Sequence, residues 1–199
     1  MIPSFEQPAE ALARALIGVT LLFHGVGGEI VETEAYDAND PASHSFAGPR
    51  QRNATMFGPA GHAYVYRIYG LHHCLNITCG AGAAVLVRAL APTRGVAAMT
   101  RRRGMDDVSR LCSGPGRLSA ALGIDLSVDG ADLRAPPFTW IERRGDPLIA
   151  AGPRIGISRA VDRPWRFGLA NSPFLSRPIS SDDASPASSA SRRGSTGMV

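Results

Sequence analysis

The amino-acid sequence predicts an α+β (mixed α/β) fold. Strand-like and helix-like runs both occur, but they do not alternate in the regular order of a doubly wound sheet. The length of 199 residues suits one domain with a core that needs no disulfide staples. We therefore expect one domain over residues 1–179. A disordered tail is expected over residues 180–199, where Ser, Ala, Pro and Asp dominate.

The first elements follow from hydrophobic periodicity and glycine positions. Residues 8–17 place apolar side chains at helical spacing and are followed by a glycine, which predicts an N-terminal helix. Residues 19–23 predict a short strand, residues 25–28 a turn and residues 29–36 a second strand. Residues 37–61 hold many turn formers. They predict a long ordered loop, of the kind that usually has a function.

The middle of the chain predicts a hairpin. Residues 62–69 and 74–79 are rich in aromatic and β-branched side chains, and the tip falls near Tyr69-Gly70-Leu71. The later pattern predicts a strand over residues 84–90, a helix over 93–103, part of another helix over 118–122, and strand and loop after residue 147.

Two carboxylates and an aromatic ring share one face of the second strand. In extended backbone Glu32, Glu34 and Tyr36 point to the same side. If that side is buried, each carboxylate raises the pKa of the other, and one of them suits a general base that activates water. The alternative is a solvated sheet face whose acids pair with arginines, and spacing alone favours that alternative.

Tyrosines gather in the predicted hairpin. Tyr64 and Tyr66 share a face, and arginine lies among them in the sequence. Such a group suits a stacking platform for bases, and an aromatic residue at the tip could enter a DNA groove and unstack a step. The alternative is ordinary core packing of aromatic pairs across the strands, and the pattern alone slightly favours that alternative.

Composition limits the chemistry. The formal net charge is +4, and all 21 basic residues are arginine, so Schiff-base chemistry on a lysine is excluded. The basic excess is compatible with a polyanionic partner. The sequence contains no stretch of 18 apolar residues, so it predicts no membrane span. The N-terminus lacks the pattern of a signal peptide, and three scattered cysteines form no disulfide framework. We expect a cytoplasmic protein.

Two further groups of residues have weaker signals. His72, His73, Cys74 and Cys79 match no common zinc spacing, and we expect neither a metal nor a cofactor. The run around Gly114, Gly116 and Arg117 is glycine-rich and precedes a helix, so its amides could hold a phosphate. The three arginines of residues 101–103 suit a solvated helix face that adds salt-dependent DNA affinity.

Taken together, seven runs resemble the alkyladenine (3-methyladenine) DNA glycosylase family. They occur in the family's order at residues 31–36 (Val-Glu-Thr-Glu-Ala-Tyr), 41–44 (Pro-Ala-Ser-His), 52–57 (Arg-Asn-Ala-Thr-Met-Phe), 64–70 (Tyr-Val-Tyr-Arg-Ile-Tyr-Gly), 74–77 (Cys-Leu-Asn-Ile), 85–92 (Val-Leu-Val-Arg-Ala-Leu-Ala-Pro) and 112–118 (Cys-Ser-Gly-Pro-Gly-Arg-Leu). Several long motifs in register are far more specific than any single one.

The resemblance implies a curved, mostly antiparallel sheet with surrounding helices and a protruding hairpin that probes the minor groove of double-stranded DNA. It implies that the protein is a monofunctional glycosylase that acts as a monomer on damaged purines in the bacterial nucleoid. It assigns roles to seven residues: Glu34 activates water, Arg88 helps to hold that water, Tyr36, His44 and Tyr66 form walls around a flipped base, Asn76 crowds the 2-amino group of guanine, and Tyr69 is the wedge that fills the gap in the duplex.

The chain also departs from the family pattern. Leu71 and His72 stand where family members often have Met and Tyr, and Gly168 is small where a larger residue is expected. Two other functions were weighed. A damage sensor without catalysis would need a disabled base at position 34, where Glu34 is present. A nucleosidase for free nucleosides would gain nothing from the basic excess or from a wedge at Tyr69.

Overall fold

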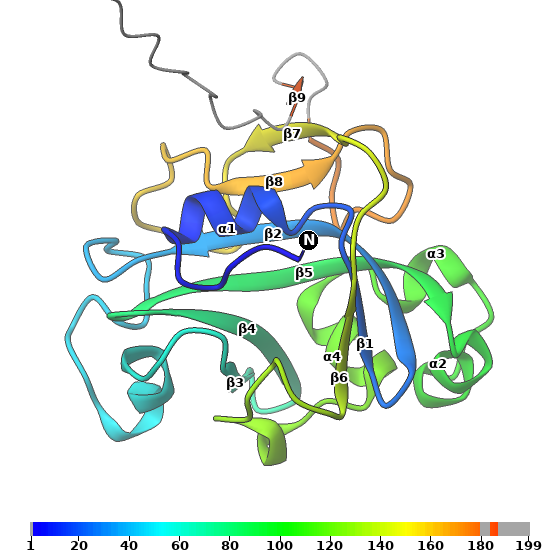
Figure 1. The fold of residues 1–199 in the computed structure, drawn as a ribbon, viewed down its shortest axis with the longest axis horizontal. Coiled ribbons are helices and arrows are strands. Elements are labelled where there is room, and N and C mark those ends of the chain that lie inside the picture. Colours follow the sequence, from blue (N-terminus) through cyan, green and yellow to red (C-terminus); the bar gives the residue numbers. More distant parts are fainter. Residues whose placement is uncertain (1, 180–183, 187–199) are drawn as a thin grey trace, which may run out of the picture.

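The computed structural model describes residues 2–179 and 184–186, and its described strands form one antiparallel sheet (Figure 1). The main path of the sheet is β3-β4-β5-β2-β8-β7-β9, while β1 pairs with both β2 and β6. The strands are β1 (Thr20–Phe23), β2 (Val26–Tyr36), β3 (Ala63–Ile68), β4 (His72–Gly80), β5 (Ala83–Arg94), β6 (Phe138–Ile141), β7 (Leu148–Gly152), β8 (Arg166–Leu169) and β9 (Ala184–Pro186). The predicted α+β class with a mostly antiparallel sheet is confirmed.

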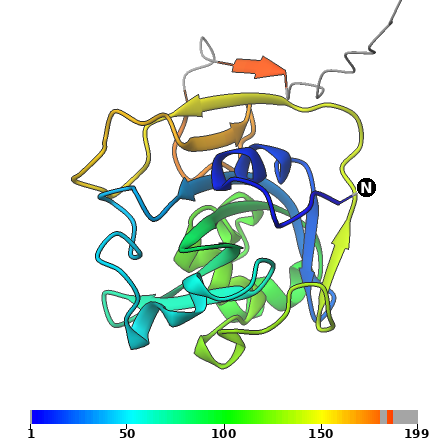
Figure 2. The same ribbon diagram turned by 60° about the vertical axis from the view of Figure 1, so that its left-hand side comes forward.

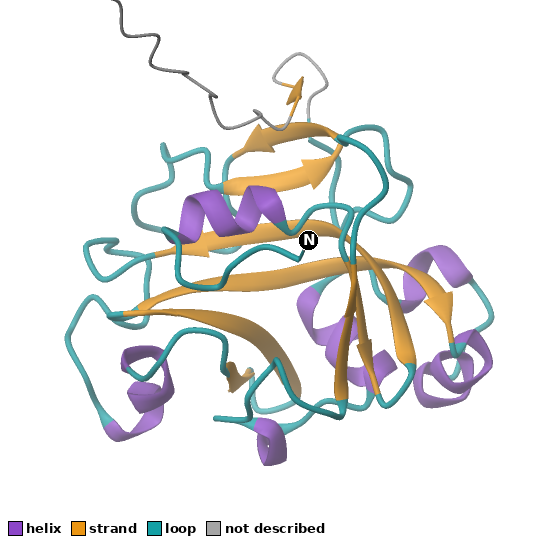
Figure 3. Ribbon diagram, in the orientation of Figure 1, coloured by secondary structure: helices purple, strands orange, loops and turns teal. Residues whose placement is uncertain are grey.

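The helices are short and surround the sheet. They are α1 (Ala9–Ala15), α2 (Val96–Arg103), α3 (Val108–Leu111) and α4 (Pro115–Leu122), with 3-10 turns η1 (Gln51–Phe57) and η2 (Leu126–Val128). Figure 3 shows α2, α3 and α4 gathered beside one end of the sheet, away from α1. No helix in the described ranges is long and apolar enough to cross a membrane.

The tight turn between β1 and β2 has two residues with positive φ. His24 has φ 50° and Gly25 has φ 74°, the backbone of the two-residue turns that best join twisted antiparallel strands. Because the turn is this short, β2 begins at Val26, earlier than the turn signals over residues 25–28 predicted. A Cβ on Gly28 would lie 1.9 Å from the carbonyl oxygen of Ala91, so the neighbouring strand requires glycine there.

The helix predicted over residues 93–103 is wrong at its start. Strand β5 continues through Pro92 to Arg94, because its ladder with β2 runs on to the pair Gly27 and Arg94. Gly95, with φ 69°, then turns the chain into α2. The sequence pattern also missed β6 and η1, the second of which lies inside the predicted long loop.

A β-bulge places Arg88 on β5. Glu32 pairs with Ala89 and Thr33 with Val87, so Arg88 is the extra residue between two partners on the longer strand. Bulges of this kind redirect a side chain and increase the local twist. Here the redirected side chain points to the face of the sheet that carries Glu32 and Glu34.

The two faces of β2 have different neighbours. Thr33 donates its hydroxyl hydrogen to the carbonyl of Ala13, so its face is covered by α1. Figure 2 shows α1 lying along β2 on that side. The hydrophobic core includes Leu12 from α1 and Leu16 directly after it, and reaches through β2 and β5 to α4. The opposite face of β2 carries the two carboxylates.

The end of the chain differs from its prediction at three residues. Ala184–Pro186 form β9, which pairs with β7, although residues 180–199 were expected to be a disordered tail. The rest of that predicted tail lies outside the described residues. This pairing is possible because the edge of β7 offers unpaired backbone groups to an extended segment that reaches it.

Candidate active site

A cavity of about 360 Å³ opens on the carboxylate face of the sheet, between the β3–β4 hairpin, the loop after β2 and the start of α4. This volume lies in the usual range for small-molecule sites, about 300–1,000 Å³. The cavity brings together most of the residues singled out from the sequence: Glu34, Tyr36, His44, Tyr66, Tyr69, Asn76, Arg88 and Gly116. Gly114 and Arg117 are not among its lining residues.

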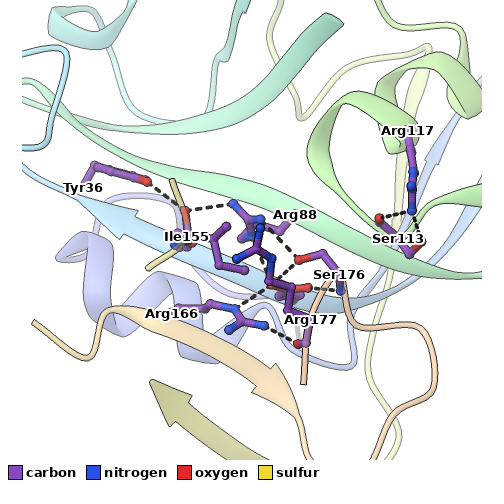
Figure 4. Close-up of polar contacts among 10 residues, drawn as sticks. Tyr36, Arg88, Ser113, Arg117, Ile155, Arg166, Ser176 and Arg177 are labelled. Atoms are coloured by element: carbon purple, nitrogen blue, oxygen red, sulfur yellow. Dashed lines mark hydrogen bonds and ion pairs between the residues drawn. The ribbon is translucent and has the colours of Figure 1, made fainter. Parts of the chain in front are cut away.

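Glu34 is fully buried and is held by three donors. Arg88 Nη1 lies 3.2 Å from Oε2, the Tyr36 hydroxyl donates to the same oxygen at 2.8 Å, and the Ile155 amide donates to Oε1 at 2.7 Å. Figure 4 shows these donors converging on one point beside β2. The prediction that the carboxylates of this strand are solvent-exposed, which spacing favoured, is therefore wrong.

The two carboxylates of β2 have different surroundings. Glu32 is also fully buried, but it accepts hydrogen bonds from Arg88, Arg166 and the Ser176 amide and hydroxyl. Four donors occupy its oxygens. Of the described residues that line the cavity, only Glu34 is acidic. A carboxylate must reach the substrate to act as a base, so the geometry selects Glu34 from the pair.

Burial sets the basicity of Glu34. The pKa of its carboxyl is raised, mainly because burial disfavours the charged form, and the Glu32 charge raises it further. The Arg88 charge and the hydrogen bonds from Ile155 and Tyr36 lower the same pKa in part. A carboxylate with a raised pKa accepts a proton more readily at neutral pH than an exposed one.

Aromatic rings form two walls of the cavity. The His44 and Tyr66 rings meet edge to face, with centroids 4.5 Å apart, and the rings of Tyr64 and Tyr66 are 5.6 Å apart. Tyr64 packs in a small apolar cluster with Met56, while Tyr66 is half-buried and faces the cavity. The tyrosines therefore fit both interpretations of the sequence pattern: both line the cavity, and Tyr64 also belongs to a small buried cluster.

His44 is positioned as a neutral ring. Its Nδ1 lies 3.0 Å from the Tyr64 hydroxyl oxygen. Its pKa is lowered by burial first and by the positive charge of Arg52 second. Burial also raises the pKa of Tyr64 to about 12, so that hydroxyl keeps its proton. The backbone of this loop is held by Asn53, whose side chain donates to the carbonyl of His44.

Asn76 lies at the floor of the cavity on β4. Its amide nitrogen donates to the carbonyls of Tyr64 and Cys74, at 3.0 and 3.3 Å. These two bonds fix the side chain, which is buried. The side chain is therefore a rigid part of the cavity surface, as a residue that excludes a bulkier ligand must be.

The tip of the β3–β4 hairpin is exposed and apolar. Tyr69 is 82% exposed and Leu71 78% exposed, and both flank Gly70. Tyr69 adopts a left-handed φ of 52°. This conformation is uncommon for a bulky residue and holds the ring outward. The sequence placed the tip correctly, and Tyr69 lines the cavity mouth.

The start of α4 lies against the hairpin. A Cβ on Gly116 would be 2.8 Å from the Cβ of His72, so glycine permits this contact. Gly114 is the N-cap of α4 and has φ 132°, and Arg117 is exposed and donates to Ser113 (Figure 4). Gly116 thus belongs to the cavity wall, whereas Gly114 and Arg117 lie on the adjoining surface.

Sequence reasoning missed a buried support behind the cavity. Arg154 forms a bidentate ion pair with Asp40, and both side chains are fully buried. Its guanidinium lies 4.7 Å from the centroid of the Tyr36 ring. The signal was weak: Asp40 lies in a turn-like Asn-Asp-Pro run, and Arg154 follows a proline. The contribution of the Ile155 amide to Glu34 could not be found from residue types, because it is a backbone group.

No group of three or more His, Cys, Asp or Glu side chains suited to a metal ion lies within residues 2–179 and 184–186. Cys74 and Cys112 are buried and Cys79 is half-buried, and all three are free thiols. Burial raises the pKa of the Cys79 and Cys112 thiols to about 12, so neither behaves as a reactive thiolate.

Comparison with known proteins gives a consistent result. Residues 3–173 match the family described as methylpurine-DNA glycosylase. A protein of Nitrosospira multiformis is 55% identical over 186 residues, which cover 91% of this chain and 96% of the relative. A protein of Rhodopseudomonas palustris strain HaA2 is 56% identical over 178 residues, 88% of this chain and 89% of the relative.

A protein of Granulibacter bethesdensis is also 56% identical over 178 residues, covering 86% of this chain and 84% of the relative. Each of these three relatives has the name "Putative 3-methyladenine DNA glycosylase". The family match spans the cavity and nearly the whole sheet. The chain belongs to the methylpurine-DNA glycosylase family.

Proposed function

We propose that this protein is a monofunctional DNA glycosylase that releases alkylated or otherwise damaged purines from double-stranded DNA and so starts base excision repair. One observation carries the proposal: Glu34, buried and with a raised pKa, is the acidic side chain that reaches an aromatic-walled cavity. The family match and the names of the relatives support the substrate class.

Glu34 acts as the general base. It takes a proton from a water molecule that attacks the anomeric carbon of the flipped nucleotide, and the N-glycosidic bond to the base breaks. Arg88, 3.2 Å from Glu34, helps to hold this water and balances the charge of the carboxylate. An N-alkylated purine already carries positive charge and leaves readily, so one base suffices where ordinary glycosidases need two carboxylates.

The cavity selects the base. Tyr36, His44 and Tyr66 form the walls around a purine that has been flipped out of the stack. The fixed side chain of Asn76 crowds the 2-amino group of normal guanine. Flipping costs least where pairing is already damaged, which contributes to selectivity. Tyr69, exposed at the hairpin tip, is the wedge that enters the minor groove and fills the gap.

The surface beside the cavity holds the DNA backbone. Gly114, Gly116 and Arg117, at the start of α4 beside the cavity, contact phosphates of the DNA strand, and the arginines of α2 add salt-dependent affinity. Such contacts carry no sequence preference, as a repair enzyme requires. We propose that the protein works as a monomer in the bacterial cytoplasm, associated with the nucleoid.

The proposal excludes a lyase step through lysine, because the chain contains no lysine. Borohydride is expected to trap no covalent adduct with damaged DNA, and strand scission is expected to need added alkali or another enzyme. A trapped adduct would reveal an amine nucleophile such as the N-terminus.

The decisive test replaces Glu34 with glutamine. Base release from duplexes that carry 3-methyladenine, 7-methylguanine, hypoxanthine or ethenoadenine is measured in a single turnover, beside binding to an abasic-site duplex. We expect Glu34→Gln to keep binding and to lose about 10²- to 10⁴-fold in the rate of release. Glu29→Gln, a half-buried acid on the same strand outside the cavity, is the matched control and is expected to keep the wild-type rate.

Other outcomes would overturn the proposal. Release at the wild-type rate by Glu34→Gln would exclude Glu34 as the base. Binding of damaged duplex without base release by the wild-type protein would identify a damage sensor. Release from free nucleosides with no activity on duplex would identify a nucleosidase.

A further inference from the structure

The segment that follows β8 crosses the carboxylate face of the sheet. We call residues 174–179 the C-terminal strap. Ser176 donates its amide to Glu32 Oε2 at 2.5 Å and its hydroxyl to Oε1 at 2.8 Å. Arg166 on β8 donates to the carbonyl of Arg177. Figure 4 shows the strap passing beside Arg88 and Arg166, with the Ser176 side chain directed toward Arg88.

A glycine on β8 makes room for the strap. Gly168 pairs directly with Glu32 in the ladder. A Cβ at this position would lie 2.7 Å from the Cδ1 of Ile179 and 3.0 Å from the Cδ2 of Leu175. The backbone of Gly168 lies outside the left-handed region, so space is the property that requires glycine. The small residue that departs from the family pattern therefore has a function in this chain: it lets the strap approach Glu32.

One guanidinium joins the strap to the base. Arg88 directs Nε to Glu32 at 3.0 Å, Nη1 to Glu34 at 3.2 Å and Nη2 to the Ser176 hydroxyl at 3.2 Å. Three nitrogens with three fixed partners leave the planar group no freedom to rotate. Losing Ser176 or Glu32 removes a constraint on the far side of Arg88 while leaving its contact with Glu34 in place.

We propose that Glu32 and Ser176 are positioning residues: together with the C-terminal strap they hold Arg88 in the orientation that aligns Glu34 and the attacking water. Neither residue lines the cavity, so both act through Arg88. The inference rests on the proposed function, because it assigns Arg88 and Glu34 the roles given there. Preorganised donors of this kind lower the barrier of the chemical step rather than strengthen binding.

The charge of Glu32 has a separate consequence. Glu34 faces Glu32 and Tyr36 on its own strand, Arg88 on β5, Tyr66 and Cys74 on the hairpin, and Arg154 beyond β7. Within this set the Glu32 charge raises the pKa of Glu34. Replacing Glu32 by glutamine therefore lowers that pKa, so the base stays ionised to lower pH and the acid limb of the rate profile moves down.

The test compares Ser176→Ala, Gly168→Ala and Glu32→Gln with the control Ser172→Ala. Ser172 lies just before the strap and accepts a hydrogen bond from the Phe174 amide. Single-turnover release of 3-methyladenine, the Kd for an abasic-site duplex and amide hydrogen exchange over residues 174–179 are measured for each folded variant. Melting temperatures show which variants fold.

We expect Ser176→Ala to slow release by about 3- to 10-fold with an unchanged Kd. Gly168→Ala is expected to slow release to a similar extent and to speed exchange across the strap. Glu32→Gln is expected to lose about 10- to 100-fold, because its hydrogen bonds join charged groups, and its acid limb moves to lower pH. Ser172→Ala is expected to keep the wild-type rate.

A wild-type rate for both Ser176→Ala and Gly168→Ala would overturn the inference, and these mild variants decide the question even where Glu32→Gln fails to fold. Equal losses in rate and in binding would instead show a general structural role and would also overturn it. The proposed function fails separately, through an inactive wild type or an active Glu34→Gln.

Discussion

Two buried acid–arginine pairs lie side by side in this protein, and only one of them borders the cavity. Asp40 and Arg154 form a bidentate pair in which both side chains are fully buried. Glu34 and Arg88 are almost as well buried, but both line the cavity. Burial and pairing therefore do not distinguish a structural pair from a chemical one. Access to a cavity distinguishes them, because only an accessible carboxylate can exchange a proton with substrate or water.

Tyr36 connects the two pairs. Its hydroxyl donates to Glu34 at 2.8 Å, and the guanidinium of Arg154 lies against its ring. Arg154 also donates to the carbonyl of Ala35, at 3.0 Å. The closed pair thus supports a wall of the cavity from behind, and the open pair, to which we assign the chemistry, lies in front of that wall.

The largest expected effect is a loss of folding stability when the Asp40–Arg154 pair is broken. Asp40→Asn leaves Arg154 charged and buried without its partner, which costs about 3–5 kcal/mol. For a domain of this size the melting temperature falls by roughly 10 °C. Thermal unfolding followed by circular dichroism measures the change. A variant Asp40→Asn that melts within about 2 °C of the wild type but loses base release would contradict a structural role for this pair. Asp40 would then act in the chemistry.

The next effect concerns binding alone. Tyr69→Ala removes an exposed ring that touches neither pair, and stacking of a base on an aromatic ring contributes about 1–3 kcal/mol. We expect the Kd for a damaged duplex to rise about tenfold or more, with an unchanged melting temperature. Leu71→Ala, at the same tip, is the natural comparison for the size of the effect. Unchanged binding in Tyr69→Ala would contradict the wedge.

A smaller effect, on the rate and its pH dependence, is expected at Tyr36, which contacts both pairs. In the wild type, the hydrogen bond from Tyr36 lowers the pKa of the Glu34 carboxyl. Tyr36→Phe keeps the ring against Arg154 but removes this hydrogen bond. The pKa of Glu34 therefore rises, and a base must be ionised, so the acid limb of the rate profile moves to higher pH. The rate at its plateau is expected to fall by about 2- to 10-fold. A shift to lower pH would contradict the assigned hydrogen bond.

The smallest effect belongs to an arginine outside both pairs. Arg117 is exposed and donates to Ser113. Arg117→Ala is expected to weaken binding to damaged and undamaged duplex equally and to reduce the slope of log K against log salt by about 1. Arg144→Ala, at another exposed arginine on the loop between β6 and β7, serves as the comparison. A loss of affinity for damaged duplex alone would show that Arg117 contacts the lesion rather than the DNA backbone.

The sequence correctly predicted those features of the site that depend on residues close together in the chain. Alternation along an extended strand placed Glu32, Glu34 and Tyr36 on one face, and the structure confirms it through their shared contacts. The hairpin tip at Tyr69-Gly70-Leu71 followed from composition and glycine position. Local backbone geometry decides both features, so a local pattern can predict them.

Features that depend on distant segments could not be predicted in this way. The bulge that turns Arg88 toward Glu32 arises from the register between β2 and β5. The helix expected from residue 93 gave way to strand because β2 offered a partner as far as Arg94. Spacing alone favoured a solvated face for the carboxylates, since the strap that covers Glu32 comes from 144 residues further along the chain.

By itself the sequence determined the chemical inventory and the local geometry: arginine without lysine, two acids on one strand face and a glycine-bearing aromatic hairpin. Only the tertiary structure distinguishes the two acids and supports Glu34 as the proposed base. Glu32 and Glu34 are the same residue type on the same face of one strand, and both are fully buried. The strap, β8 and Arg88 on β5 together occupy Glu32 with four donors, whereas Glu34 borders the cavity. Basicity and access depend on desolvation and on long-range contacts, which no local pattern contains.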